Sequence, residues 1–544
     1  MEKIFIGVAW PYANGELHVG HLAGAYLAPD IFARFHRLKG NNVLMVSGSD
    51  MHGTPVSLAA EKAGMKPTEF AKKAHQNHKQ VLADIGVSFN LYTSTATENH
   101  RDVVQKEFLT LLDKGFLIKK TTDQLYCVTD KMFLPDRYVV GECPHCHNSE
   151  ARGDQCDSCG KALDPTELID PKCKVCDNTP ELKQTTHFFL DLPKLEPKLK
   201  EWIKTKKDVW REYVWNFTEG LLKEGLKQRA ITRDLNYGIP VPIEEFKDKV
   251  IYVWFEAVTG YLSAAIEWSN SRHSERSEES WTTFWKNPDC RHYYFIGKDN
   301  ILFHTLIWPA ILMGYDETLN LPYDVPANQY LNLGGQKLSK SKGALVTVRS
   351  LLDEYGVDAV RFYFTKNMPE TRDGEFSLEE FIKQNNGILV ANLGNFINRT
   401  LVFIDKFFEG QIPEGTLEEK VKQAIDKAFV DVTDNIDKCH FRNSLEDVLK
   451  LSSYGNSLFD EGRPWETVKT DKSKCAQTIY NCIQVVSALS TLMKPFLPQA
   501  SEKLSKQLNL QTDNKRWEFR PIQKDHQVKN VEPVFRKLEY LTRI

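Results

Sequence analysis

The chain has 544 residues, 41% of them hydrophobic, with 70 lysines and arginines against 73 aspartates and glutamates, a net charge of −3. At roughly 150 residues per domain, this length predicts three or four domains with ample core. The near-neutral balance excludes a protein that binds nucleic acid over its whole surface, so any such contact must be a local patch. No apolar run approaches the roughly 18 residues of a membrane span, and the N-terminus lacks the apolar segment of a signal peptide. We therefore expect a soluble, cytoplasmic protein.

The first stretch predicts a strand, a turn and a helix that opens with two histidines. The apolar run Ile4–Ala9 is typical of a buried strand, and Asn14-Gly15 marks the turn that follows. His18 and His21 stand at the start of the helical pattern Leu22–Lys39, where they share one face. Free backbone N–H groups and the helix dipole favour phosphate at this position. Alone, the motif also fits a loop with two surface histidines.

Later stretches extend this α/β pattern. The strand Asn42–Ser47 runs into GSDMHGTP, which places an Asp and a His at the end of a strand, where open α/β sheets bind ligands. Residues 55–115 are largely helical in pattern, and alternation of strands and helices implies a parallel sheet. The pattern resumes near Asp234 with a strand-like VIYVWF, a helix from Ala257, a strand HYYFIG and a helix from Asp299.

The cysteines indicate a metal site, because six of the eleven form C-x-x-C pairs. The first two pairs have the spacing of a zinc knuckle, in which four thiolates complete a closed, structural shell: Cys143, Cys146, Cys156 and Cys159. A redox C-x-x-C would need a neighbouring βαβ unit, whereas two pairs in a polar loop fit metal better. We expect one structural zinc per chain. Cys173 and Cys176 either bind a second zinc with help from elsewhere or bind none, and the sequence leaves both readings open.

The second half of the chain changes from mixed to helical patterning. Ser269–Ser280 is polar and without periodicity, which predicts an exposed insertion to which we assign no function. A short strand from Gln329 leads to a loop with the sequence KLSKSKG. Alone, this loop also fits a solvated lysine cluster, but together with HVGH it favours phosphate chemistry. From Phe381 onward the apolar positions recur three and four apart, which predicts a bundle of helices.

These motifs together resemble the HIGH and KMSKS signatures of class I aminoacyl-tRNA synthetases. Longer stretches are similar to the methionyl-tRNA synthetase family in particular, and they follow in the right order from Ile4 to about Leu497: WPYANGELHVGH, GSDMHGTP, MFLPDRYVVGECPHC, HFFLDLPKL, YVWFEAVTGY, FIGKDNILFHT and KLSKSKG. Leu338 stands where the family has the Met of KMSKS, a volume-conserving change that we expect to be neutral. The resemblance implies an α/β fold with a Rossmann-like parallel-sheet catalytic domain, split by a zinc-knuckle connective insertion and followed by an α-helical bundle.

The resemblance also implies boundaries for five parts. These are the first half of the catalytic domain (1–115), the connective insertion (116–233), the second half of the catalytic domain (234–325), the KMSKS-type connector (326–380) and the helical anticodon-binding bundle (381–544).

The implied activity is ATP-dependent ligation of methionine to tRNA. L-Methionine attacks the α-phosphate of ATP, pyrophosphate leaves, and the methionyl group passes to the 3′-terminal adenosine of initiator and elongator methionine tRNA. Such a reaction needs alignment and charge stabilisation rather than a protein nucleophile. The resemblance assigns catalysis to His18, His21, Lys337 and Lys340, with Mg²⁺ held by the triphosphate. It assigns ATP binding to Tyr12, Asn14, Gly20, Gly297, Lys298, Asp299 and Lys340.

The amino-acid pocket implied by the resemblance is apolar and aromatic. Such a lining suits a flexible thioether, because sulfur makes favourable contacts with aromatic rings. Asp50 would pair with the substrate ammonium group, and the remaining pocket residues would be Trp10, Tyr12, Trp254, Ala257, Val258, Tyr261 and His304. At helical spacing, the residues from Trp254 to Tyr261 would otherwise be read as ordinary core. Trp10 and Val258 stand where the family often carries Leu and Pro, so we expect a slightly different pocket shape.

The helical region would read the anticodon of methionine tRNA. Trp465 matches the stacking tryptophan of the family, and aromatic stacking is a common way to hold an unstacked base. Asn395 and Arg399 share a helix face and are similar to polar anticodon contacts of the family, although a solvated face fits them equally well. The resemblance ends near the bundle, without the further dimerising domain of some family members, which favours a monomer.

Three other functions deserve comparison with this one. A nucleotidyltransferase could share HxGH, but it would need neither the zinc insertion nor the bundle. A non-catalytic zinc-containing RNA-binding protein would be expected to have lost His18, His21 or Lys340, and all three are present. Another class I synthetase, such as the leucine or cysteine enzyme, is the nearest rival, and parallel amino-acid tests would separate it.

Overall fold

Five parallel strands form the central sheet, in the order β14-β13-β1-β2-β3. They are β1 (Lys3–Val8), β2 (Asn42–Ser49), β3 (Leu91–Ser94), β13 (Cys290–Gly297) and β14 (Ala327–Asn328). The order reverses between β1 and β13, and open α/β sheets bind ligands beyond the carboxyl ends of their strands at such a point. The predicted parallel sheet is confirmed. This computed structural model describes residues 1–135, 138–153, 156, 158–159, 161, 163–272, 280–333, 346–510 and 516–539.

Successive residues of β1 enter different cores because strand side chains alternate between faces. Ile4, Ile6 and Val8 pack with the helix α2, while Phe5 joins the core on the other face. The helices around the sheet are α1 (Val19–His21), α2 (Leu27–Leu38), α3 (Thr54–Lys62), α4 (Pro67–Asp84), α5 (Glu98–Asp113), α8 (Val253–Arg272), α9 (Trp281–Trp285) and α10 (Trp308–Tyr315).

Two of the predicted elements differ in the structure. VIYVWF contributes only the short strand β12 (Val250–Ile251), which pairs with β11 (Thr232–Arg233), and α8 already begins at Val253. The aromatic and β-branched residues favoured a strand, but Phe255 and Leu262 pack into the core on one face of a helix. The stretch 55–115 also contains the edge strand β3, too short for a clear period-2 signal.

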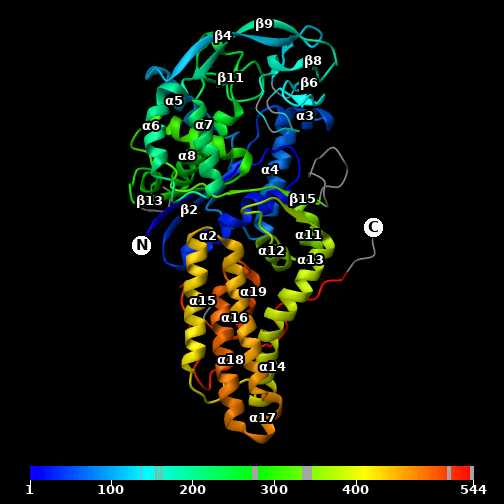
Figure 1. Cartoon of the computed structure of the whole chain (residues 1–544), viewed down its shortest axis with the longest axis vertical. Coiled ribbons are helices and arrows are strands. Elements are labelled where there is room, and N and C mark those ends of the chain that lie inside the picture. Colours follow the sequence, from blue (N-terminus) through cyan, green and yellow to red (C-terminus); the bar gives the residue numbers. More distant parts are fainter. Residues whose placement is uncertain are drawn as a thin grey trace.

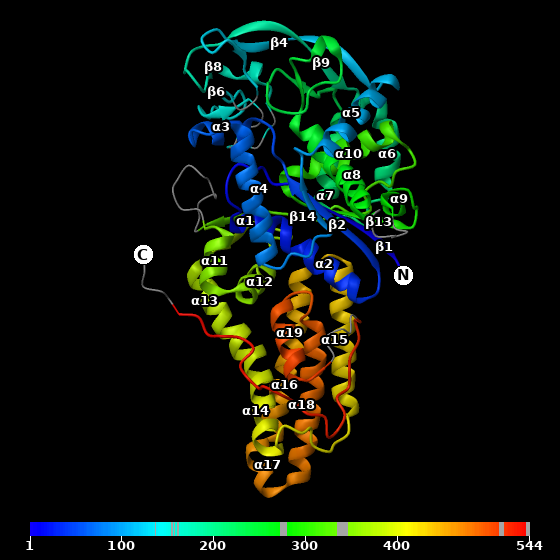
Figure 2. The same ribbon diagram turned by 180° about the vertical axis from the view of Figure 1, so that it is seen from behind.

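The connective insertion forms the end of the molecule opposite the bundle (Figures 1 and 2). A four-stranded antiparallel sheet spans it, formed by β4 (Leu117–Cys127), β5 (Met132–Phe133), β9 (Glu181–Leu190) and β10 (Arg229–Ala230). The cysteine region has its own sheet of β6 (Val139–Glu142), β7 (Ala151–Arg152) and β8 (Ile169–Cys173). The predicted helical piece is present as α6 (Leu192–Lys204) and α7 (Glu212–Glu224).

A small connector joins the sheet to the bundle. It contains β15 (Leu331–Leu333), paired with β16 (Gly374–Phe376), and the helices α11 (Val348–Tyr355) and α12 (Val357–Lys366). Gly356 separates the two helices with a φ of 84°, a conformation that glycine adopts readily.

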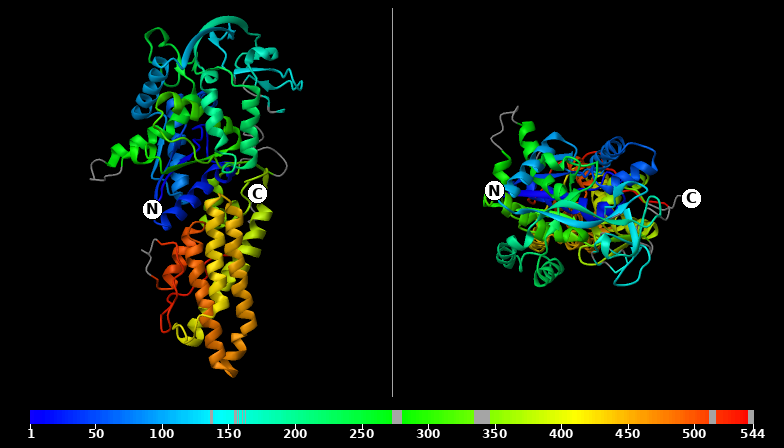
Figure 3. Two further views of the ribbon diagram at one scale, coloured as in Figure 1. Left: turned by 60° about the vertical axis from the view of Figure 1, so that its left-hand side comes forward. Right: turned by 90° about the horizontal axis from the view of Figure 1, so that it is seen from above.

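The bundle consists of long, nearly parallel helices below the sheet (Figure 3). Its helices are α13 (Leu378–Gln384), α14 (Asn395–Phe408), α15 (Glu419–Asp437), α16 (Phe441–Gly462), α17 (Pro464–Thr470), α18 (Lys472–Leu492) and α19 (Pro498–Gln507). The helical run Leu378–Phe408 is long and apolar enough to cross a membrane, but half of its most apolar window is buried, as in the core helix of a bundle. Residues 516–539 run along the bundle without a helix, contrary to the prediction for this segment (Figure 2). Trp517 holds them instead, by packing edge-on against Phe35 and Phe429.

Candidate functional site

The two histidines of HVGH stack on one another. Their ring centroids lie 3.7 Å apart, and the backbone N–H of His18 donates to Nδ1 of His21 over 3.2 Å. The prediction that they share one face is confirmed. Gly20 lies between them in α1, and Asn14 lies half-buried in the preceding turn. The helix then widens into a π-helical segment, Leu22–Tyr26, before α2, and such segments are frequent at functional sites.

The described residues on either side of the KLSKS loop lie against this motif. His18 pairs with Thr347 in an antiparallel bridge, the N–H of Val19 donates to the carbonyl of Val346 over 3.2 Å, and that of Val348 donates to Leu17. On the other side, β15 contacts α1. Lys337 and Lys340 themselves lie outside the described residues. Their loop therefore leaves and rejoins the described chain beside the stacked histidines.

The predicted ATP-binding residues of FIGKDN lie at the carboxyl end of β13, beside β1. Gly297 ends the strand. The Lys298 ammonium forms an ion pair of 2.7 Å with Asp373 and lies 4.0 Å from the ring centre of Tyr330. The Tyr330 hydroxyl donates to Asp299. The side chains of Lys298 and Asp299 thus hold the connector against the edge of the sheet where nucleotides bind in open α/β folds.

The aromatic residues predicted for the amino-acid pocket gather between β2, α8 and the segment before α10. The indole of Trp10 fits between two glycines, since a Cβ at Gly48 would lie 2.4 Å from its ring and one at Gly260 would lie 2.8 Å away. Tyr12 and Phe303 flank Trp254, with ring centroids 6.5 and 4.4 Å away.

A hydrogen-bonded pair closes this pocket. Nδ1 of His304 donates to the carbonyl of Asn300 over 2.8 Å, so its Nε2 accepts a hydrogen bond of 2.8 Å from the Tyr261 hydroxyl. Burial lowers the pKa of His304 to about 4, against a weaker opposing effect of the Asn300 bond, and keeps the ring neutral at pH 7. Val258 is buried nearby on α8, and Ala257 is half-buried beside it. His304 itself lies in a second π-helical segment, Phe303–Ile307.

Asp50 lies at the edge of this pocket in an acidic environment. It is 4% exposed, and its backbone is bonded to Pro11 and Ala13. Burial and the nearby Glu256 carboxylate raise the pKa of Asp50 well above its usual value. Among the described residues, no cation lies within ion-pair distance of its carboxylate, which accepts only the N–H of His52, over 3.3 Å. The carboxylate is thus suited to a positively charged ligand.

Glu256 and His52 form a buried pair beside Asp50 that sequence analysis did not assign to the site. Both oxygens of Glu256 lie 3.1 Å from Nδ1 of His52. Burial alone would lower the pKa of His52, but Glu256 outweighs it and raises that pKa. Burial likewise opposes ionisation of Glu256, but His52 and His100 lower its pKa overall. Each partner thus favours the charged form of the other, and an ammonium ion bound beside Asp50 would counter the burial and the Glu256 charge that raise the pKa of Asp50.

The predicted zinc ligands form a compact group. The ligand atoms of Cys143, Cys146, Cys156 and Cys159 all lie within 4.8 Å of one another, with sulfur–sulfur distances of 3.9 Å (Cys143 to Cys159) and 3.6 Å (Cys146 to Cys156). Tetrahedral zinc with Zn–S bonds of about 2.3 Å places its sulfurs about 3.8 Å apart. This donor set therefore fits a zinc ion.

A second group of four candidate metal ligands contains the third C-x-x-C pair, for which the sequence offered no partner pair. Cys173 and Cys176 meet Cys127 and Asp130, again with all ligand atoms within 4.8 Å. The Asp130 carboxylate lies 3.1 Å from the sulfurs of Cys127 and Cys173. The turn is also built like the first knuckle, because Cys173 N–H donates to Asn178 just as Cys143 N–H donates to Asn148. Three thiolates and a carboxylate are a donor set that zinc accepts.

The tip of the bundle presents the predicted tryptophan. Trp465, at the start of α17, is 45% exposed and stacks on Phe459, with ring centroids 6.1 Å apart. The Arg399 guanidinium lies 4.1 Å from the ring centre of Phe459 and pairs with Asp460 over 2.6 Å. Asn395 is exposed one helical turn away. Phe459 and Asp460 therefore orient Arg399 beside the exposed indole.

Comparisons with known proteins agree along the whole chain. The family model for class I tRNA synthetases (M) matches residues 4–401, and that for the anticodon binding domain of methionyl tRNA ligase matches residues 410–540. The methionine–tRNA ligase of Dehalococcoides mccartyi (strain CBDB1) is 46% identical over 99% of this chain and 97% of its own. That of Thermomicrobium roseum is 45% identical over 93% of this chain and 87% of its own. The chain belongs to the methionine–tRNA ligase family of class I synthetases.

A solved structure supports the fold of this family. Methionyl-tRNA synthetase of Mycobacterium tuberculosis, in complex with methionyl-adenylate, superimposes with a TM-score of 0.81 at 24% identity, over 98% of this chain and 100% of that one. At this identity the likeness concerns the fold alone.

Sequence analysis gave no role in the candidate sites to four residues, although three of them had a weak signal. Cys127 and Asp130 have the C-x-x-D spacing of a half-knuckle, but an Asp at that position does not stand out in a C-x-x-C search. His52 was placed with Asp50 at the ligand-binding end of a strand, but it was given no role in the site. Glu256 is separated from His52 by 204 residues, so only the fold brings them together.

Proposed function

We propose that this chain activates L-methionine with ATP and transfers the methionyl group to the 3′-terminal adenosine of methionine tRNA, both initiator and elongator. Membership of the methionine–tRNA ligase family gives the reaction class, an ATP-dependent aminoacyl-tRNA ligation. The single observation that carries the proposal is the stacked His18–His21 pair, backbone-bonded to the residues that follow the KLSKS loop. The five-part division predicted from the sequence is retained as part of this proposal.

Two neighbouring segments, HVGH and the KLSKS loop, supply the groups that act on the phosphates. His18 and His21 donate to oxygens of the α- and β-phosphates as negative charge develops there. Lys337 and Lys340 close over the departing pyrophosphate from the adjacent loop. The remaining ATP contacts come from Tyr12, Asn14, Gly20, Gly297, Lys298 and Asp299, and Mg²⁺ accompanies the triphosphate.

Recognition of methionine combines one charge with an apolar slot. Asp50 pairs with the substrate ammonium group, since its carboxylate lacks a cation among the described residues. The thioether enters the space bounded by aromatic rings, where sulfur–ring contacts are favourable: Trp10, Tyr12, Trp254, Tyr261 and His304, with Ala257 and Val258. Because Tyr261 donates to His304, neither polar atom needs a partner on the substrate.

The bundle tip binds the anticodon of methionine tRNA. Trp465 stacks on a base, while Arg399 and Asn395 contact base edges or phosphate from the same side. We assign zinc to both cysteine groups, where it stabilises the connective insertion. None of the eleven cysteines forms a disulfide in the described residues, and zinc-bound thiolates suit a reducing compartment. We assign the protein to the cytoplasm as a monomer.

Amino-acid-dependent exchange of pyrophosphate into ATP tests this function. It should be strong with methionine, weak with leucine, isoleucine, valine and cysteine, and lost in His21→Ala and Lys340→Ala. Strong exchange with another amino acid would make the chain a different class I synthetase and would reject the pocket. No exchange from folded, zinc-loaded protein would favour a non-catalytic RNA-binding role.

A further inference from the structure

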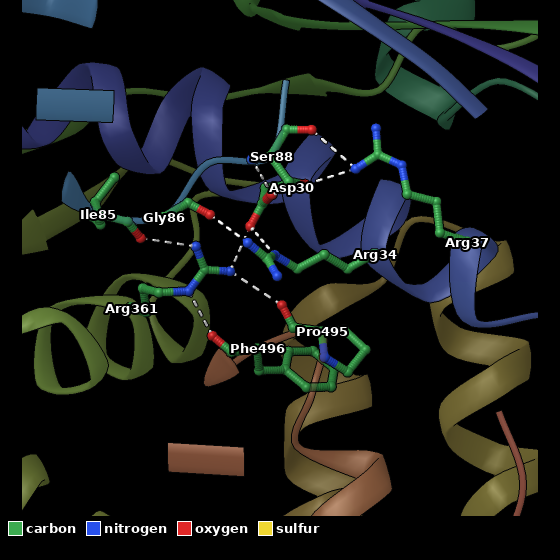
Figure 4. A network of polar contacts seen from close by, with 9 residues as sticks. All are labelled: Asp30, Arg34, Arg37, Ile85, Gly86, Ser88, Arg361, Pro495 and Phe496. Atoms are coloured by element: carbon green, nitrogen blue, oxygen red, sulfur yellow. Dashed lines mark hydrogen bonds and ion pairs between the residues drawn. The ribbon is translucent and has the colours of Figure 1, made fainter. Parts of the chain in front are cut away.

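One buried arginine joins three parts of the chain that are far apart in sequence (Figure 4). Arg361 lies on α12, and its side chain is fully buried. Nε donates to the carbonyl of Phe496 (2.7 Å), Nη1 to that of Ile85 (3.3 Å), and Nη2 to that of Pro495 (3.1 Å) and to Oδ2 of Asp30 (2.7 Å). Each nitrogen of the guanidinium therefore has a partner, and the partners come from three elements.

Asp30 provides the other half of the contact from α2. Its Oδ2 also accepts from Nε of Arg34 over 2.8 Å, and its Oδ1 accepts from the backbone N–H and the hydroxyl of Ser88, over 2.8 and 2.6 Å. Arg34 in turn donates to the carbonyl of Gly86. With both oxygens bonded, the Asp30 carboxylate is held in one orientation (Figure 4).

α12 and two of the parts that Arg361 bonds, α2 and the bundle turn, have different places in the proposed reaction. α2 continues the helix that begins at the stacked histidines. α12 follows α11, whose first turn adjoins Thr347, the bridge partner of His18. Pro495 and Phe496 lie in the turn between α18 and α19 of the bundle, which carries Trp465 at its far tip. Arg361 is thus bonded both to the bundle and to the helix behind the phosphate site.

A buried ion pair is a poor device for stability alone, because the cost of removing two charges from water offsets their attraction. Apolar side chains could fill this junction equally well. What the planar guanidinium contributes instead is geometry, because its N–H donors point in fixed directions. All of its hydrogen bonds can form only when the elements that carry the acceptors have one relative placement.

We propose that Arg361 is a positioning residue for tRNA charging, which sets the bundle against α2 so that one tRNA engages the anticodon tip and the phosphate site at the same time. A tRNA that binds at both ends gains from the second contact only if the spacing matches its own. This inference rests on the proposed function and concerns the step that uses both ends of the tRNA.

The test compares one tRNA transcript with the cognate anticodon and the same transcript with its first anticodon base replaced. The ratio of their aminoacylation kcat/KM values measures how much anticodon binding contributes to charging. In Arg361→Met this ratio should fall by about tenfold or more, because small misplacements far from the chemistry have effects of this order. Methionine-dependent pyrophosphate exchange, which uses no tRNA, should stay within about twofold of the parent. Loss of exchange in the parent protein would instead reject the proposed function.

Two further variants keep the test decisive. Arg361→Met with Asp30→Asn removes both charges but leaves an oxygen for Ser88, so it should fold and show the same fall in the ratio. Lys366→Met is the matched control, because Lys366 lies on the same helix and pairs with Glu446 of the bundle at the surface (3.1 Å). An unchanged ratio in the folded Arg361 variants, with only a lower melting temperature, would show a purely structural role. An equal fall in Lys366→Met would also overturn the assignment to Arg361.

Discussion

At the scale of single residues, the proposed recognition of the amino acid depends most directly on the carboxylate of Asp50. It is buried beside the Glu256–His52 pair, and a substrate ammonium would favour its ionised form, a cation that Glu107 does not meet. Loss of one partner from a buried, hydrogen-bonded charge pair costs about 2 to 5 kcal/mol. We therefore expect Asp50→Asn to raise the KM for methionine roughly 30-fold or more in pyrophosphate exchange.

Glu107 offers the control for this prediction. It is also a buried carboxyl group, but burial raises its pKa to about 8 despite a hydrogen bond from Thr259, so it is mostly protonated at pH 7. Glu107→Gln thus replaces one neutral group with another and should leave the KM for methionine unchanged. A KM that is the same in Asp50→Asn and the parent would reject the role of Asp50.

His304 should make stability depend on pH. Its pKa in the folded protein is about 4, lowered by burial from the ordinary 6.5, so the unfolded chain binds a proton at a pH where the folded chain does not. Stability is therefore fully present above pH 6.5 and falls as pH drops toward 4, by about 2 kcal/mol at pH 5 from this residue. Urea unfolding at pH 7 and pH 5 should show a smaller difference in His304→Gln than in the parent. Equal differences in the two proteins would contradict this prediction.

Single residues were predictable where a short motif contained them. His18 and His21 form one short motif and the first four zinc ligands form another, so the spacing within each motif placed their side chains together. Arg361 had no such signal, because its partners lie 331 and 135 residues away in the sequence. Because arginines are mostly exposed in proteins, an arginine within a helical pattern is predicted to lie at the surface until the elements packed around it are known.

At the scale of elements, we expect the two cysteine groups to determine the stability of the cysteine region around β6, β7 and β8. The core of this region is small and contains Cys143, Cys156 and Cys173 among its buried residues, so metal binding must supply much of its folding free energy. We expect two zinc ions per chain. Elemental analysis with thiol titration should give one in Cys127→Ser and two in Cys290→Ser, which removes a buried thiol elsewhere. One zinc in the parent would leave the Asp130 group without metal.

The sequence patterns predicted an element where its apolar residues recur with the helical period, and they failed where that period is hidden. α16 shows the helical spacing, and so does α2, although most residues of α2 are buried. The first turn of α8 did not, because Val253–Phe255 consists of residues that favour strands and no polar face marks the helical period. The π-helical segments before α2 and α10 could not be predicted either. Their residues are as apolar as those of an α-helix, and only the pattern of backbone hydrogen bonds differs.

At the scale of the whole molecule, the sheet and α17 lie at opposite ends of the bundle (Figure 1). The order of the parts along the chain was predictable because each has its own composition and periodicity. Their relative placement was not, because it depends on contacts such as those of Arg361, which no local pattern contains.

This separation predicts that tRNA charging and methionine activation can be changed independently. Trp465 is exposed at the tip and touches nothing near the stacked histidines, so Trp465→Ala should leave pyrophosphate exchange unchanged. Loss of base stacking worth about 1 to 3 kcal/mol should lower the aminoacylation kcat/KM for tRNA roughly 5-fold to 150-fold. Val430→Ala, an even more exposed apolar site on the bundle helix α15, serves as the control and should change neither assay. A parallel loss of exchange in Trp465→Ala would mean that the bundle tip also maintains the catalytic layer, and an unchanged charging rate would remove Trp465 from the anticodon site.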